Sequence, residues 1–251
     1  RISKIQEETF KNLNIGERQN LQEWIAANPE CLGEELLIIQ KEFDGFDDTR
    51  ERLDLLAIDK LGNVVVIENK LDDSGKDVTW QCIKYASYCS GLKKSQLLDI
   101  YQSYLDQKKD AESALTNICD FFEVEDFDEV KINSGSNQRI IIISRQYRKE
   151  VTSSVLWLLN YGLDIKCFEV TPYSDHNQLY ITVEQIIPIK AAEEFTIGIA
   201  EKTQENIASE KVLKKRNIVR LKFWNELLKV MNTKTSQFQN ISPGKYAWIG
   251  T

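Results

Sequence analysis

The segment from Arg52 to Lys70, RLDLLAIDKLGNVVVIENK, carries two carboxylates and an amine on two short apolar stretches joined by a tight turn. Asp54 lies in the first stretch, and Glu68 and Lys70 lie at the end of the second. Because residues two apart in a strand point to the same side, Glu68 and Lys70 share a face. A carboxylate inside an apolar strand, as at Asp54, needs a partner or a metal. The spacing therefore predicts a metal-dependent hydrolytic site at this hairpin.

The expected chemistry is hydrolysis of a phosphodiester. This reaction needs charge neutralised at the phosphate and a hydroxide-like nucleophile near neutral pH, and a divalent cation supplies both. Mg²⁺, or Mn²⁺ in its place, needs only one or two protein carboxylates because it retains water ligands. We expect Asp54 and Glu68 to be ligands, with the backbone carbonyl of Asn69 as a further one. Lys70 would orient the attacking water and offset charge in the transition state.

This strand–turn–strand segment resembles the core of the PD-(D/E)XK nuclease superfamily. The resemblance assigns the catalytic roles to Asp54, Glu68 and Lys70, and it extends to the helix expected after the lysine. There Gln81 and Tyr85 form Q-x-x-x-Y, four residues apart on one helical face. In several branches of the superfamily the glutamine lies beside the active site and the tyrosine supports the helix.

The resemblance continues toward the N-terminus in E-x-x-x-L-x-x-W-I-x-x-N-P, which runs from Glu17 to Pro29. It implies that the first helix contributes a glutamate near the metal, with Glu17 as the candidate and Glu23 as the second choice. Over roughly residues 15–188 the pattern is similar to the NucS-like or tRNA-endonuclease-like branch and to bacterial homologues of unknown function. Asn69 departs from that pattern, because an apolar residue is often found between the glutamate and the lysine.

Alternation of apolar and polar residues predicts the elements that position these groups. The order, helix, three strands, helices, strand, helix and two strands, predicts an α/β fold with a mixed central β-sheet flanked by helices. Expected helices cover 17–27, 78–90, 95–120 and 150–163, and expected strands cover 36–43, 53–59, 63–69, 139–145, 164–170 and 178–186.

Composition shifts divide the chain into three parts. Residues 1–189 are expected to form the nuclease-like domain, and the polar stretch 190–217 a helical connector. Residues 218–251 begin with an amphipathic helix at 218–231 and read as the start of a truncated or small second domain. The chain begins with Arg1 rather than Met, so its true start is expected to be missing.

Composition also excludes several classes of protein. No apolar run approaches the roughly 20 residues that span a bilayer, which predicts a protein outside the membrane. Five cysteines without a C-x-x-C pair make a zinc site or a disulfide framework a poor interpretation and favour a reducing cytoplasm. A single histidine, His176, leaves no histidine-rich metal site and little room for a Ser-His-Asp site.

The net charge of −7 is unusual for an enzyme that acts on nucleic acid, but basic residues gather in 131–150 and 209–222. Such a patch can bind phosphate on an acidic protein, although it can equally be a solvated charged face. The residues expected to contact phosphates are Arg52, beside the site, and three from the first basic segment, namely Arg139, Arg145 and Arg148.

These observations predict a Mg²⁺- or Mn²⁺-dependent endonuclease acting on DNA, and related nucleases suggest that two copies could pair as a homodimer. The alternative is a catalytically silent nucleic-acid-binding or assembly module that keeps the fold. A hydrolase for another phosphate ester is a third hypothesis. No glycine-rich phosphate loop is present, which argues against a nucleotide-driven motor.

Overall fold

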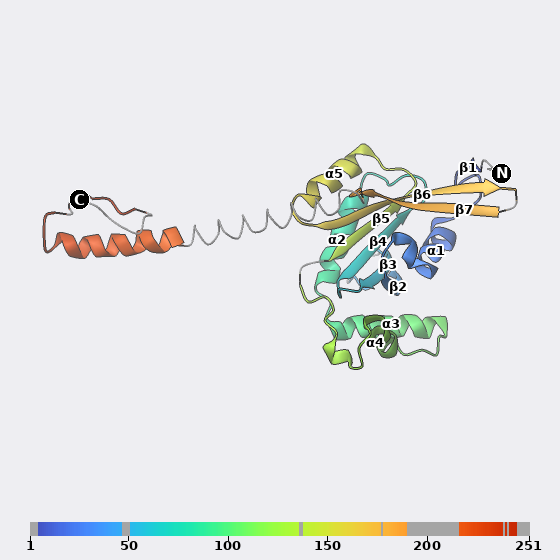
Figure 1. Cartoon of the computed structure of the whole chain (residues 1–251), viewed down its shortest axis with the longest axis horizontal. Coiled ribbons are helices and arrows are strands. Elements are labelled where there is room, and N and C mark those ends of the chain that lie inside the picture. Colours follow the sequence, from blue (N-terminus) through green and yellow to red (C-terminus); the bar gives the residue numbers. More distant parts are fainter. Residues whose placement is uncertain are drawn as a thin grey trace. The chain divides into compact units, whose positions relative to one another are not determined.

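A computed structural model describes residues 5–46, 51–135, 138–176, 178–189, 216–237, 239 and 241–244. The chain divides into two compact units, residues 1–194 and 195–251. A seven-stranded mixed sheet forms the centre of the first unit (Figure 1). Its strands are β1 (Gln6–Glu7), β2 (Leu36–Phe43), β3 (Leu53–Asp59), β4 (Val64–Lys70), β5 (Arg139–Ser144), β6 (Asp164–Asp175) and β7 (Gln178–Ile187).

The strand order is β1-β6-β5-β4-β3-β2, with β7 paired to β6. The strands β2, β3 and β4 form an antiparallel meander, whereas β4, β5 and β6 run parallel. Every residue of β3 and β5 is buried, and so is every residue of β4 except Lys70. Strands covered on both faces are apolar throughout, which explains the runs VVVI and IIII in the sequence.

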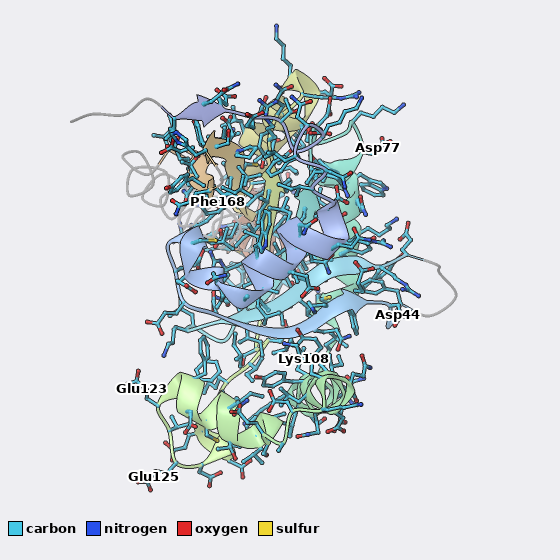
Figure 2. The ribbon with its side chains drawn as sticks, turned by 90° about the vertical axis from the view of Figure 1, so that its right-hand side faces the viewer. Asp44, Asp77, Lys108, Glu123, Glu125 and Phe168 are labelled. Carbon is cyan, nitrogen blue, oxygen red and sulfur yellow. The ribbon has the colours of Figure 1, made fainter. Side chains whose placement is uncertain are left out.

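Helices cover both faces of this sheet (Figure 1). A π-helical turn, Glu17–Leu21, leads into α1 (Gln22–Ala27). The turn packs on one face through Leu21, and α1 packs there through Ile25. On the other face α2 (Val78–Ser90) and α5 (Lys149–Leu159) pack against β5 and β6. The remaining helices α3 (Lys94–Lys108) and α4 (Ala114–Phe122) lie beside β2 (Figures 1 and 2). Short 3₁₀ turns occupy Pro29–Leu32 and Phe127–Glu129.

The mixed α/β architecture expected from the sequence is therefore confirmed, with two differences. The single helix expected over 95–120 is two helices, because Lys109 adopts a left-handed conformation with φ 58° that ends α3. The N–H groups of Lys109 and Asp110 close this end on the carbonyls of Asp106 and Leu105. Strand β6 also continues past residue 170, because its last residues pair with β7 and with the unexpected strand β1.

The second unit contains a helix at 216–232, which includes the helix expected at 218–231. The expected connector, 190–217, lies outside the described residues except for its last two positions. Among the described residues, every helix is too short or too polar to cross a membrane.

Candidate active site

The site lies where β3 and β4 separate. Their pairing ends at Leu55 and Ile67. Just beyond this pair, Oδ2 of Asp54 accepts a hydrogen bond of 2.7 Å from the backbone N–H of Asn69. Asp54 is 4% exposed, so this bond satisfies a buried donor of β4 and fixes the carboxylate between the two strands.

Glu68 and Lys70 share one face of β4, as their spacing predicts. Nζ of Lys70 donates a hydrogen bond of 2.6 Å to Oε1 of Glu68. The side chain of Glu68 is 1% exposed, and that of Lys70 is 24% exposed. The second oxygen of Glu68, Oε2, is buried and has no hydrogen-bond partner among the described residues. A buried carboxylate oxygen without a donor is costly, so this atom needs a proton or a cation.

The charges in this cluster shift one another's titration. Burial raises the pKa of Glu68 to about 8, and the negative charge of Asp54 adds to the shift. Burial likewise raises the pKa of Asp54 to about 6, against the opposing effects of the Asn69 N–H and Lys70. Burial lowers the pKa of Lys70, but the carboxylates around it, Glu68 above all, outweigh this and raise it.

Glu17 reaches the same cluster from the π-helical turn before α1. Its Oε2 accepts a hydrogen bond of 2.9 Å from the backbone N–H of Leu71, the residue that follows Lys70. The charge of Glu17 contributes to the raised pKa values of Asp54, Glu68 and Lys70. Glu23, the second choice, instead pairs with Lys41 at the surface.

On α2, Gln81 and Tyr85 act as a pair. Nε2 of Gln81 donates to the Tyr85 hydroxyl at 3.0 Å, and that hydroxyl donates to the backbone carbonyl of Arg52 at 2.9 Å. Burial raises the pKa of Tyr85 to about 12, so the hydroxyl stays protonated. Tyr85 thus ties α2 to the residue before β3 and orients the Gln81 side chain.

Glu42 is a further carboxylate that the sequence interpretation missed. The register of β2 on β3 pairs the residues on either side of Glu42 with those on either side of Asp54, so the two acids lie opposite each other. Glu42 has a left-handed backbone, φ 50°, which is strained for a non-glycine residue in a strand. Nε of Arg18 forms an ion pair with Glu42 at 3.2 Å. In the sequence Glu42 is an acidic residue before an aromatic residue at the end of a strand, and this pattern does not indicate that it lies at the site.

Gln22 was also missed. It is 2% exposed, and its Nε2 donates to the backbone carbonyl of Asp54 at 3.0 Å. This bond holds the start of α1 against β3 beside the carboxylate. Spacing in the sequence could have predicted that Gln22 is buried. It lies next to Leu21 and three residues before Ile25, on the apolar face of the helix.

Three of the four expected phosphate-contacting arginines lie near the site. Lys70 pairs with Ser144 at the end of β5, so Arg145 and Arg148 follow at the same edge of the sheet. Arg148 pairs with Asp73 at 2.7 Å, and Arg145 with Glu7 at 2.9 Å. Arg52, beside Asp54 in the chain, is half-exposed and lies 3.8 Å from Asp44, which Figure 2 labels.

Arg139 lies elsewhere. It begins β5, at the opposite end of the strand from Ser144. Its guanidinium is buried and pairs with Glu34 at 2.6 Å and with Asp59 and Asp164 at 2.9 Å. The structure does not bring Arg139 to the candidate site, because these three carboxylates enclose it.

The donor set around Glu68 fits Mg²⁺ or Mn²⁺. Among the residues that the structure describes, no three side chains of His, Cys, Asp or Glu form a ready-made metal cluster. Magnesium, however, accepts one or two carboxylates and keeps its waters, and it prefers oxygen ligands. Asp54 and Glu68 offer such oxygens, and Oε2 of Glu68 has no donor among the described residues. The expected carbonyl ligand belongs to Asn69, the next residue of β4.

Comparison with known proteins adds little. No protein-family model and no curated protein matches the chain. An EndoMS–double-stranded DNA complex is 15% identical with a TM-score of 0.35, and covers 61% of this chain and 44% of its own. A repair endonuclease from Pyrococcus abyssi is 18% identical with a TM-score of 0.34, and covers 61% of this chain and 47% of its own. The chain thus spans less than half the length of either structure, and TM-scores this low carry no argument about activity.

Proposed function

We propose that this chain is a Mg²⁺- or Mn²⁺-dependent endonuclease that hydrolyses phosphodiester bonds in DNA, built on the core of the PD-(D/E)XK superfamily and its NucS-like branch. One observation carries the proposal. The carboxylate of Glu68 is buried beside Asp54 and Lys70, and its Oε2 has no donor within the described residues. Such an atom suits a cation-binding site better than a structural ion pair.

Asp54, Glu68 and the carbonyl of Asn69 would hold the ion. When bound, it would neutralise charge on the phosphoryl oxygens and lower the pKa of a water molecule. Lys70 would donate hydrogen bonds from Nζ to the nucleophile or to a phosphate oxygen and so offset the charge of the transition state. Gln81 of α2 would lie beside the active site, as the resemblance implies. Glu17 would hold the chain just after Lys70 through its hydrogen bond with the N–H of Leu71.

DNA is the proposed substrate because three arginines flank this edge of the sheet. Arg52, Arg145 and Arg148 could exchange their carboxylate partners for phosphates, which position a protein on nucleic acid. Cutting both strands of a duplex would need two sites, so a homodimer belongs to the proposal. All five cysteines are free thiols, which supports a reducing, cytoplasmic location.

The test is cleavage of single-stranded, duplex, branched and mismatched DNA, and of RNA, with Mg²⁺, Mn²⁺ or EDTA. Wild type is compared with Glu68→Gln and with the control Glu23→Gln. The control makes the same change at a glutamate that pairs with Lys41 and whose side chain is 48% exposed. We expect metal-dependent cleavage that Glu68→Gln abolishes and Glu23→Gln preserves.

Other outcomes separate the alternatives. Cleavage that survives Glu68→Gln would mean that the site is misplaced or the activity is a contaminant. Absence of cleavage together with absence of Glu68-dependent Mn²⁺ binding would favour the catalytically silent nucleic-acid-binding module.

A further inference from the structure

A groove with exposed aromatic walls runs between α2 and α5. The groove is open to solvent and has a volume of about 440 Å³. Trp80 of α2 is 68% exposed, and Trp157 of α5 is 58% exposed. Beside Trp157 lies Tyr161, with ring centroids 4.5 Å apart and 66% of the tyrosine exposed. Several large aromatic side chains that are solvent-exposed on one surface indicate a binding site.

Polar groups lie among these rings. Lys76, Thr79 and Ser153 line the same groove. Lys76 and Ser153 are exposed, whereas the hydroxyl of Thr79 is buried. A ligand in the groove can therefore bond to an ammonium group and a hydroxyl group. The groove therefore suits a ligand with flat apolar faces and hydrogen-bonding edges.

The groove begins at the edge of the sheet that carries the candidate active site. Lys70 and Ser144 are paired neighbours at the ends of β4 and β5. The loop after Lys70 leads to Asp77, the residue before α2 that Figure 2 labels, and the loop after Ser144 leads to α5. A hydrogen bond of 2.9 Å from the Ser74 N–H to the Gln146 carbonyl joins the two loops. Both helices thus start next to the site, and the two lie adjacent in Figure 1.

We propose that the α2–α5 groove binds unpaired bases of a DNA single strand. Bases would stack on Trp80 and Trp157, and base edges would bond to Ser153. Lys76 in the groove and Lys149 at the start of α5 would contact phosphates. Base–aromatic stacking tolerates any sequence because every base has a π face. This inference rests on the proposed nuclease function, since the groove would hold the strand that continues from the scissile phosphate.

The test measures binding of a fluorescein-labelled oligothymidylate of about 15 nucleotides, long enough for typical single-strand sites. Fluorescence anisotropy is recorded in EDTA, so the measurement does not depend on catalysis. Trp80→Ala and Trp157→Ala are compared with Tyr180→Ala, which removes a 43% exposed aromatic from β7. We expect each tryptophan variant to bind roughly tenfold more weakly or worse, and the tyrosine variant to bind like wild type. Trp157→Phe, which keeps a ring, should retain most of the affinity.

Three results would overturn the proposal. One is unchanged oligonucleotide affinity in both tryptophan variants, provided that circular dichroism shows them folded. Another is equal weakening in Tyr180→Ala. The third is a loss of self-association in sedimentation without loss of affinity, which would make the groove an interface between two copies. If Glu68-dependent cleavage persists in any of these cases, the proposed nuclease function stands while the groove proposal fails.

Discussion

At the scale of single residues, Glu68 is subject to two opposing effects. Lys70 stabilises its charged form through a 2.6 Å hydrogen bond, whereas burial and the neighbouring charge of Asp54 disfavour it. Burial is the larger effect, and the pKa of Glu68 rises. The carboxylate is therefore destabilised when it is ionised and no cation is bound.

We expect the metal-free protein to lose stability as the pH rises from about 4.5, the ordinary pKa of Glu68, to about 8 in the folded state. In this window the folded chain holds a proton on Glu68 that the unfolded chain has lost, so raising the pH favours unfolding. Glu68→Gln should remove most of this pH dependence, a difference on the order of a few kcal/mol, and leave the smaller part that comes from the raised pKa of Asp54. Urea denaturation in EDTA at pH 5 and pH 8 measures it. Equal pH slopes for both proteins would contradict the assignment.

Lys70 should matter for the reaction and not for the cation. We expect Lys70→Ala to lower kcat by about 10²–10³-fold, the cost of losing one preorganised donor at a developing charge. Calorimetric binding of Mn²⁺ should persist in this variant and be lost in Asp54→Asn. A Lys70→Ala protein that cleaves like wild type would show that another group stabilises the transition state.

At the scale of elements, Arg139 joins three segments of the fold. It lies on β5 and binds Asp59 at the end of β3, Asp164 at the start of β6, and Glu34 before β2. Arg139 is 7% exposed, and Asp59 is 4% exposed. Removing the cation would leave the buried carboxylate of Asp59 without its ion-pair partner.

Arg139→Met should therefore lower the free energy of unfolding by about 3–5 kcal/mol, the usual cost of breaking a buried pair. The matched control is Arg148→Met, because the pair of Arg148 with Asp73 is half-exposed on both sides and its loss should leave the free energy of unfolding almost unchanged. Urea denaturation of both variants gives the comparison. A larger loss in Arg148→Met would reverse the roles assigned to the two arginines.

The turn between β3 and β4 depends on Gly62. Its φ is 80°, and a Cβ at this position would lie 1.9 Å from the carbonyl oxygen of Lys131. We expect Gly62→Ala to destabilise the fold by about 3–5 kcal/mol, from left-handed strain and overpacking together. Gly75→Ala is the control, because Gly75 has a φ of 68° but nothing within 4 Å of the added Cβ. It should cost only about 1–2 kcal/mol, and equal thermal shifts would show that the clash relaxes.

The elements predictable from sequence were those with a local signal. Apolar runs and the glycine turn gave β2 to β5, and Asp54, Glu68 and Lys70 came together as their spacing indicated. The end of α3 at Lys109 could not be predicted, because no glycine or proline marks it in the sequence. The sequence suggested that Arg139 contacts phosphate, because the carboxylates that bind it are distant in the chain. The most distant of them is Glu34. Glu42 and Gln22 reach the site only because β2 and α1 pack beside β3, and this packing also joins segments that are distant in the chain.

At the scale of the whole molecule, a net charge of −7 opposes binding to a polyanion. Long-range attraction is therefore weak, and affinity must come from local contacts. The arginines at the site edge are Arg52 and Arg148, which are half-exposed, and Arg145, whose side chain is 17% exposed.

We expect duplex binding in EDTA to weaken with salt by a log–log slope of about −0.9 per phosphate contacted, or about −3 for three contacts. Arg148→Ala should make the slope less steep by about 0.9, the contribution of one phosphate contact. Arg139→Lys should leave the slope unchanged, because Arg139 pairs with Glu34, Asp59 and Asp164. Fluorescence anisotropy across a salt series measures both. A changed slope in Arg139→Lys would place nucleic acid at the other end of β5.

The parallel pairing of β4 with β5 also has a consequence for the order of synthesis. Glu17, Asp54, Glu68, Lys70 and Gln81 all precede α3, whereas β5, which flanks β4 along Glu68 and Lys70, follows α4. A nascent chain that has emerged only as far as α2 carries every proposed catalytic side chain but lacks the strand that helps to exclude water from them. The proposed catalytic residues are therefore synthesised before the strand that covers them, and the site can be completed only after β5 has been made.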